Sequence, residues 1–143
     1  MGKIGGNSSI TNLGSEYAKK LFDYISEFEN TDKLNIFTSE LIRTKETAKY
    51  FIKNKISFAY LNEINSGIYD GYTYEEIKKE NCKEYKERKN NKLIYRYPEG
   101  ESYLDLINRT TNIFKDIKNK FINNENILII CHNAVLRVIY SKL

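Results

Sequence analysis

The longest strand-like pattern in the chain lies at residues 127–131, where five apolar residues follow one another without a polar interruption. Such a run is typical of an interior strand of a parallel sheet, covered on both faces. A helical pattern of apolar positions follows at once over residues 134–139. His132 and Asn133 therefore lie where a strand ends and a helix begins. Ligands bind at that edge of open α/β sheets, and helix N-termini favour anions, so we expect an anionic ligand there.

A second junction of the same kind follows the apolar segment 34–37. Thr38 and Ser39 are expected to open a helix that runs to Ile52, with Arg43 in its first turns. Arg137 is expected in the first turn after His132. Two such junctions on adjacent parallel strands would aim two guanidinium groups at one crevice, and the planar guanidinium binds phosphate oxygens in pairs. For either arginine alone, a plain surface position remains an open alternative.

The remaining pattern alternates between strands and helices. We expect helices at Ser15–Phe28, 74–89 and 103–122, a strand at 56–61 and a loop at 62–72. Two capping signals precede the later helices, in the pairs Thr73/Glu76 and Ser102/Asp105. The alternation predicts an α/β fold, a three-layer α/β/α sandwich with a mostly parallel sheet. We expect a single, partial domain over residues 1–143, truncated at both ends.

One acidic residue follows the end of a predicted strand. Glu63 lies in the loop after the segment 56–61. A partly desolvated carboxylate at that place is suited to proton transfer. A solvated loop residue is the alternative, and residue type and position alone favour it.

Composition and charge indicate which classes of partner the chain can bind, but not which reaction it catalyses. The 143 residues carry a net charge of +4, which favours an anionic small molecule at least as well as nucleic acid. Basic residues alternate with Glu80, Glu84 and Glu87, and no nucleic-acid motif is present, so we expect no nucleic-acid partner. Cys82 and Cys131 lack metal-ligand spacing and are expected to be free thiols in a reducing, cytoplasmic compartment. No apolar run is long enough to cross a membrane. We expect no metal and no cofactor.

Several sequence segments together resemble one enzyme family. They are GKIGG at 2–6, TSELIRTKETA at 38–48, LNEINSG at 61–67, YTYEEI at 72–77, YRYPEGESYLDL at 95–106 and ICHNAVLR at 130–137. The chain resembles the bisphosphatase domain of 6-phosphofructo-2-kinase/fructose-2,6-bisphosphatase, within the histidine phosphatase (phosphoglycerate mutase-like) superfamily. The 38–48 and 130–137 motifs are moderately specific for the superfamily, whereas 95–106 is highly specific for the fructose-2,6-bisphosphatase branch. The resemblance implies hydrolysis of the 2-phosphate of fructose 2,6-bisphosphate, giving fructose 6-phosphate.

The resemblance also implies catalytic roles. Arg43 would hold the phosphoryl group being transferred, and His132 would stabilise the transferring oxygens. Glu63 would be the general acid for the leaving hydroxyl and then the base for water.

Substrate-binding roles follow from the same resemblance. Residues expected to bind the 6-phosphate and the sugar are Tyr74, Arg88, Lys92, Tyr103 and Arg137. Ile4 and Gly5 would line the pocket through their backbone. Asn133 stands where the family usually has glutamine, and its shorter amide keeps the same chemistry.

The chain departs from the family at one essential position. The family's nucleophile is a histidine in an Arg-His-Gly motif, which this chain lacks, and His132 is its only histidine. We expect the nucleophile, and in the full-length protein a kinase domain, to lie upstream. Two alternatives stay open: a non-catalytic sugar-phosphate-binding relative, and a phosphoglycerate mutase-like phosphatase with another phosphorylated substrate. The upstream coding sequence would separate the enzyme from the non-catalytic relative.

Overall fold

A computed structural model describes residues 2–52, 54–122 and 126–142 of the chain. Contacts divide the chain into two compact units. The sheet unit comprises Asn7–Asn62 and Thr111–His132. The tyrosine-rich unit comprises Met1–Gly6, Glu63–Thr110 and Asn133–Leu143.

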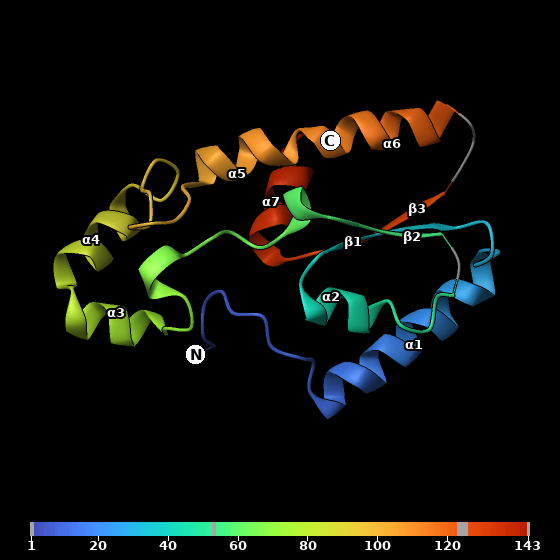
Figure 1. Cartoon of the computed structure of the whole chain (residues 1–143), viewed down its shortest axis with the longest axis horizontal. Helices are drawn as coiled ribbons and strands as arrows, with labels where there is room; N and C mark the ends of the chain where they lie inside the picture. The colour runs from blue at the N-terminus through green and yellow to red at the C-terminus, as the bar shows by residue number, and fades with distance from the viewer. Residues whose placement is uncertain (1, 53, 123–125, 143) are drawn as a thin grey trace. The chain divides into compact units, whose positions relative to one another are not determined.

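The sheet unit contains a three-stranded parallel sheet in the order β2-β1-β3 (Figure 1). Its strands are β1 (Asn35–Ser39), β2 (Lys55–Phe58) and β3 (Ile127–Ile130). All five residues of β1 are buried, as expected for its central position. The prediction that segments 34–37 and 127–131 belong to one parallel sheet is confirmed.

The prediction that segment 127–131 is an interior strand is wrong for the part of the chain that the structure describes. There β3 pairs only with β1, and its four residues are half-buried. Leu128 and Ile130 pack against the core of the unit. Their burial accounts for part of the apolar run without a second neighbouring strand.

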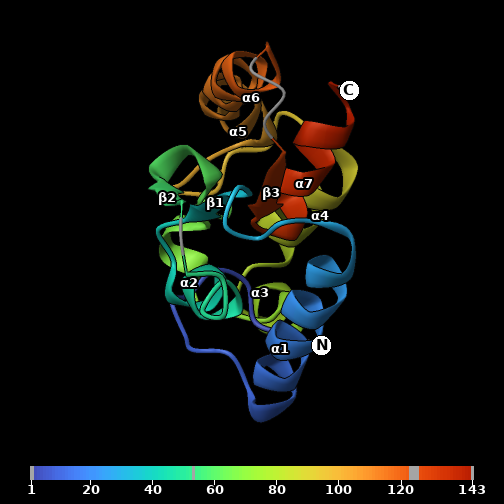
Figure 2. The same ribbon diagram turned by 90° about the vertical axis from the view of Figure 1, so that its right-hand side faces the viewer.

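Helices cover both faces of this sheet, which gives the expected α/β/α layers. Helices α1 (Asn12–Phe28) and α2 (Ile42–Thr47) lie on one face, and α6 (Asn112–Ile122) lies on the other (Figures 1 and 2). A short 3₁₀ helix, η1 (Ala59–Leu61), follows β2, so the strand expected at 56–61 ends earlier. The core of the unit consists of Leu34, Ile36, Ala48 and Phe51, with Phe22 and Ile25 of α1 packed against it.

Two helix starts differ from the prediction. Helix α1 begins at Asn12, because the Thr11 side chain accepts a hydrogen bond from the Gly14 N–H (3.1 Å); Ser15 is inside the helix. The helix expected from Thr38 to Ile52 is only the six-residue α2. Thr38 and Ser39 remain in β1, since the strand ladder pairs them with β2.

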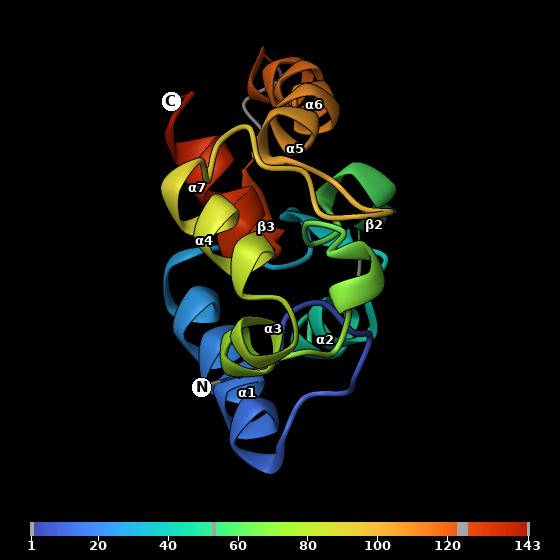
Figure 3. The same ribbon diagram turned by 90° about the vertical axis from the view of Figure 1, so that its left-hand side faces the viewer.

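The tyrosine-rich unit is mainly helical (Figure 3). Its elements are η2 (Gly67–Tyr69), α3 (Tyr74–Glu80), α4 (Cys82–Asn90), α5 (Tyr103–Thr110) and α7 (Asn133–Tyr140). The buried residues of its core are Tyr69, Ile77, Tyr95 and Tyr97. None of the described helices is long and apolar enough to span a membrane.

The two long helices predicted at 74–89 and 103–122 are each interrupted. The segment 74–89 breaks at Asn81, whose side chain accepts a hydrogen bond from the Glu84 N–H and so caps a new helix. The segment 103–122 divides between Thr110 and Asn112. Both predicted capping pairs are confirmed, since each side chain bonds the backbone N–H of the other residue.

Candidate functional site

The end of β3 places His132 beside Arg43 within the sheet unit. The His132 side chain is 7% exposed, and the Arg43 Nε donates to its Nδ1 at 3.2 Å. Arg43 is the second residue of α2, directly beyond the end of β1. Two parallel strands that pair in register bring their carboxyl ends together, which explains why residues 89 positions apart meet. The contact joins the two junctions through Arg43 and His132, whereas the expectation that Arg43 and Arg137 face one crevice stays a prediction.

The other ring nitrogen of His132 contacts a residue that the sequence did not single out. His132 Nε2 lies 2.8 Å from the Oγ of Ser39, the last residue of β1. The sequence suggested Ser39 only as a helix start, because serine is a common N-cap residue. Its position at the carboxyl end of the central strand was the available signal.

A second group of cations lies in the tyrosine-rich unit, around Arg88 of α4. The Arg88 Nε donates to the Tyr97 hydroxyl and its Nη2 donates to the Tyr74 hydroxyl, both at 2.5 Å. The guanidinium carbon also lies 4.1 Å from the centre of the Tyr74 ring, a cation–π distance. The two tyrosines therefore fix the guanidinium in position and orientation.

Tyr97 is a contact of this cluster that sequence reasoning missed. It is nearly buried, and burial together with its hydrogen bond to Tyr74 raises the pKa of the Tyr97 hydroxyl. The hydroxyl therefore stays protonated at physiological pH. Its place in the segment 95–106, which already carried the family resemblance, was the signal that could have found it.

An open pocket of about 270 Å³ adjoins this cluster, lined by Lys92, Leu93, Tyr103 and Arg137. The Lys92 Nζ lies 5.7 Å from the centre of the Tyr103 ring. Partial burial, and the charges of Arg137 and Arg88, lower the pKa of Lys92. Arg137 is in the last turn of α7, one turn later than expected, and Asn133 is the exposed first residue of that helix. An anion in the pocket would relieve the repulsion among these cations.

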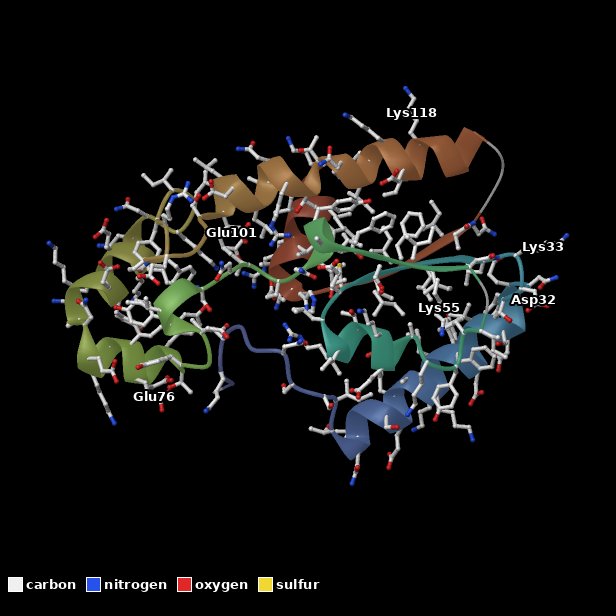
Figure 4. All side chains as sticks on the ribbon, viewed as in Figure 1. Asp32, Lys33, Lys55, Glu76, Glu101 and Lys118 are labelled. Atoms are coloured by element: carbon white, nitrogen blue, oxygen red, sulfur yellow. The ribbon has the colours of Figure 1, made fainter. Side chains whose placement is uncertain are left out.

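The loop that carries Glu63 is anchored through its backbone. The Arg109 Nη2 donates to the Glu63 carbonyl oxygen (3.1 Å), and Arg109 forms a 2.6 Å ion pair with Glu101. Glu101, labelled in Figure 4, precedes α5. Its carboxylate also accepts a hydrogen bond from the Asn65 N–H. Gly67 has φ +54°, and a Cβ there would meet the Pro98 carbonyl oxygen at 1.8 Å. Only glycine permits this close approach of the two loops.

The segment with Ile4 and Gly5 is tied to another loop of the same unit. The Ile4 N–H donates to the Tyr72 carbonyl (2.8 Å), and the Ile4 carbonyl accepts from the Gly71 N–H (2.8 Å). Gly5 has φ +69°, and a Cβ there would overlap the Asp70 carboxylate. Gly5 is therefore required by the backbone conformation and by the close approach of Asp70, whether or not it contacts a ligand.

The predicted site residues thus form three local groups. Arg43 contacts His132 in the sheet unit; Arg88 contacts Tyr74 in the tyrosine-rich unit; and Lys92, Tyr103 and Arg137 line one pocket there. Glu63 and the backbone of Ile4 and Gly5 lie in anchored loops of the tyrosine-rich unit. That all of them face one ligand stays a prediction.

A comparison with protein families decides the affiliation. Residues 3–143 match the histidine phosphatase superfamily (branch 1). The chain belongs to this superfamily.

Relatives of known name extend the match over nearly the whole chain. It is 43% identical over 139 residues to fructose-2,6-bisphosphatase of Saccharomyces cerevisiae, covering 97% of this chain and 30% of that protein. It is 42% identical over 142 residues to 6-phosphofructo-2-kinase/fructose-2,6-bisphosphatase of Arabidopsis thaliana, covering 98% of this chain and 19% of that protein. The chain thus spans less than a third of the length of either relative.

Solved structures confirm the fold of this chain. The α-ribazole phosphatase of Shigella flexneri superposes with a TM-score of 0.84 at 20% identity, covering 99% of this chain and 71% of that one. A mycobacterial glucosyl-3-phosphoglycerate phosphatase gives a TM-score of 0.80 at 15% identity, covering 99% and 71% of the two chains. The expected α/β fold of the phosphoglycerate mutase-like type is therefore established.

Proposed function

We propose that this chain is the bisphosphatase part of a protein that removes the 2-phosphate of fructose 2,6-bisphosphate and releases fructose 6-phosphate. The observation that carries the substrate assignment is the second group of cations, Arg88, Lys92 and Arg137, which is separate from the Arg43/His132 pair. A sugar bisphosphate carries two dianionic groups and needs two such clusters. The relatives named as fructose-2,6-bisphosphatases, with identities of 38–43% over nearly the whole chain, support the same substrate.

In this proposal the Arg43/His132 pair binds the 2-phosphoryl group. The Arg43 guanidinium supplies hydrogen bonds to oxygens whose charge changes during transfer, and His132 stabilises these oxygens by holding the guanidinium through its Nδ1. Glu63 gives its proton to the leaving 2-oxygen, which departs as the hydroxyl, and the resulting carboxylate then removes a proton from the attacking water.

The cations of the tyrosine-rich unit hold the other end of the substrate. Lys92 and Arg137 pair with the 6-phosphate, with Tyr103 beside it in the pocket wall. Arg88 and Tyr74 complete the site for phosphate and sugar, and Ile4, Gly5 and Asn133 contribute polar backbone or amide groups.

The nucleophile is the part that these residues do not supply. Because His132 matches the second histidine of the family and is the only one in the 143 residues, we propose that the phosphohistidine forms on a residue outside this chain. Relatives named as bifunctional 6-phosphofructo-2-kinase/fructose-2,6-bisphosphatases support a kinase domain upstream in the full-length protein. In the part of the chain that the structure describes, neither Cys82 nor Cys131 forms a disulfide, which supports the proposed cytoplasmic location.

The proposal is tested by comparing this chain with a version extended upstream to include an Arg-His-Gly strand. The short chain should hydrolyse fructose 2,6-bisphosphate orders of magnitude more slowly, because it cannot form the phosphoenzyme. Both should bind fructose 6-phosphate, measured by calorimetry. Full activity in the short chain would refute the role of the upstream nucleophile. A folded extended chain that neither hydrolyses the bisphosphate nor binds the monophosphate would refute the substrate assignment.

A further inference from the structure

We infer that Ser39 is a positioning residue for His132, and that with Thr44 it holds the imidazole as the neutral tautomer carrying its hydrogen on Nε2. The consequence for catalysis rests on the proposed phosphatase function, but the arrangement itself does not. All of the groups involved lie in the sheet unit.

The tautomer follows from the hydrogen bond that Arg43 makes. The guanidinium Nε has a hydrogen to donate and no lone pair to accept with, so the His132 Nδ1 that receives it at 3.2 Å must be unprotonated. A neutral ring with an unprotonated Nδ1 carries its hydrogen on Nε2. Nε2 therefore donates to the Ser39 Oγ at 2.8 Å.

The surroundings of Ser39 are arranged to receive that hydrogen. Its Oγ already accepts a bond from the Leu41 N–H (3.1 Å) and lies 2.8 Å from the Thr44 Oγ1. With one lone pair used by Leu41 and the other by His132, the Ser39 hydrogen is left to point at Thr44.

Thr44 completes the chain of donors. Its Oγ1 accepts from Ser39 and donates to the Leu41 carbonyl oxygen at 2.9 Å. Every hydroxyl then donates once in one direction, from His132 through Ser39 and Thr44 to the backbone. The reverse direction would place a hydrogen on Nδ1 against the Arg43 Nε–H, two donors facing each other.

Burial makes this series of hydrogen bonds a lasting constraint on the His132 ring. Ser39 is fully buried, and Thr44 and His132 are 3% and 7% exposed, so water cannot easily replace the partners. The imidazole is thereby fixed at its Nε2 end, and its Nδ1 end is the one shared with the phosphate-binding arginine. In the proposed phosphatase, Ser39 acts through His132, fixing the ring that faces the transferring phosphoryl group.

The test uses the fact that the chain has a single histidine. In uniformly ¹⁵N-labelled chain without any ligand, long-range ¹H–¹⁵N spectra report which ring nitrogen carries the hydrogen. We expect an unprotonated Nδ1, a protonated Nε2 and a slowly exchanging Nε2–H signal. A protonated Nδ1, or an average of the two tautomers, would overturn the inference.

Variants separate positioning from folding. Ser39→Ala should abolish the Nε2–H signal, Thr44→Val should broaden it, and Thr44→Ser should retain it. Ser57→Ala is the matched control: Ser57 bonds the Thr38 hydroxyl (2.9 Å) in the same sheet, and the signal should not change. An Nε2–H signal that persists in folded Ser39→Ala would refute the role of Ser39. Should that variant fail to fold, the wild-type spectrum and the Thr44 pair still decide the outcome. Because no substrate is present, failure here would leave the proposed phosphatase activity untouched.

Discussion

The two groups of cations differ in what holds them in place. In the sheet unit, both ring nitrogens of His132 are bonded, to Ser39 and to Arg43. In the tyrosine-rich unit, like charges remain near one another, and the repulsion by Arg137 and Arg88 adds to burial in lowering the pKa of Lys92. The first group is organised before any ligand arrives. In the second, the repulsion stays unrelieved, and in the proposed function the non-reacting 6-phosphate would supply the negative charge that relieves it.

Removing His132 should produce the largest effect, a loss of kcat, and should show that the two groups of cations have different roles. In the chain extended to include an Arg-His-Gly strand, His132→Ala should lower kcat by about 10²–10³-fold, the usual loss when one stabilising donor is displaced, because the Arg43 guanidinium loses the partner that holds it. The affinity for fructose 6-phosphate, measured by calorimetry, should change less than about threefold, since that ligand lacks the 2-phosphate. A loss of affinity for fructose 6-phosphate as large as the loss of kcat would contradict this difference, because it would mean that the two groups act as one.

Removing a charge from the second group should lower the affinity for fructose 6-phosphate, the quantity that the loss of His132 leaves nearly unchanged. Lys92→Gln should weaken fructose 6-phosphate binding at least about tenfold, the loss of one charge-assisted hydrogen bond. The same change should raise the free energy of unfolding by less than about 1 kcal/mol, because it relieves repulsion at a largely exposed side chain.

The pH dependence of Lys92→Gln follows from the sign of the shift. A lowered pKa means that protonating Lys92 costs more in the folded chain than in the unfolded one. The stability gained by the variant should be present at neutral pH and vanish as the pH rises through the ordinary lysine value of 10.5. Lys89→Gln, an exposed neighbour on α4, is the control and should change neither binding nor stability measurably. If urea titrations show that Lys92→Gln is less stable than wild type at neutral pH, Lys92 is not destabilised by repulsion from Arg88 and Arg137.

Removing one tyrosine hydroxyl should have a smaller effect on the same group. Tyr97→Phe takes away the acceptor of the Arg88 Nε–H and should weaken fructose 6-phosphate binding about 3–10-fold, equivalent to roughly 1 kcal/mol. Tyr85→Phe is matched, because Tyr85 packs on the same core. Equal losses in both variants would show that Tyr97 acts only through packing.

The smallest expected effect concerns the start of α5, which carries Tyr103 of the pocket. Hydrogen bonds from the Ser102 hydroxyl and its backbone N–H lower the pKa of Asp105 to about 2. A lowered carboxyl pKa stabilises the fold above about pH 4, and this contribution is lost as the pH falls through about 2. Asp105→Asn should lower the free energy of unfolding by about 0.5–1 kcal/mol at pH 7. The difference from wild type should shrink toward pH 2, and exposed Glu80→Gln should show no such trend in urea titrations.

Local structure was predictable from the sequence where residues close together in the chain determine it. The apolar runs located β1 and β3, and the capping pairs located the starts of α3 and α5. The strand ends then placed Arg43 near His132, as observed.

Features that depend on distant partners were not predictable in this way. Thr38 and Ser39 resemble a helix start, but the ladder to β2 keeps them in β1. Apolar periodicity continues through the break at Thr111 and so could not reveal it, and the charged segment 74–89 has too few apolar residues to show the break at Asn81. The roles of Ser39 and Tyr97 depend on His132 and Arg88, whose positions only the folded chain supplies.

The path of the chain has a consequence for cooperativity. The backbone passes from one compact unit to the other four times, after Gly6, Asn62, Thr110 and His132. Any continuous fragment that contains all of one unit therefore includes a large part of the other. Neither unit can be separated by truncation, and unfolding either one frees the ends of segments that the other holds together. The chain should accordingly lose its structure in one concerted transition, with the two groups of cations lost together.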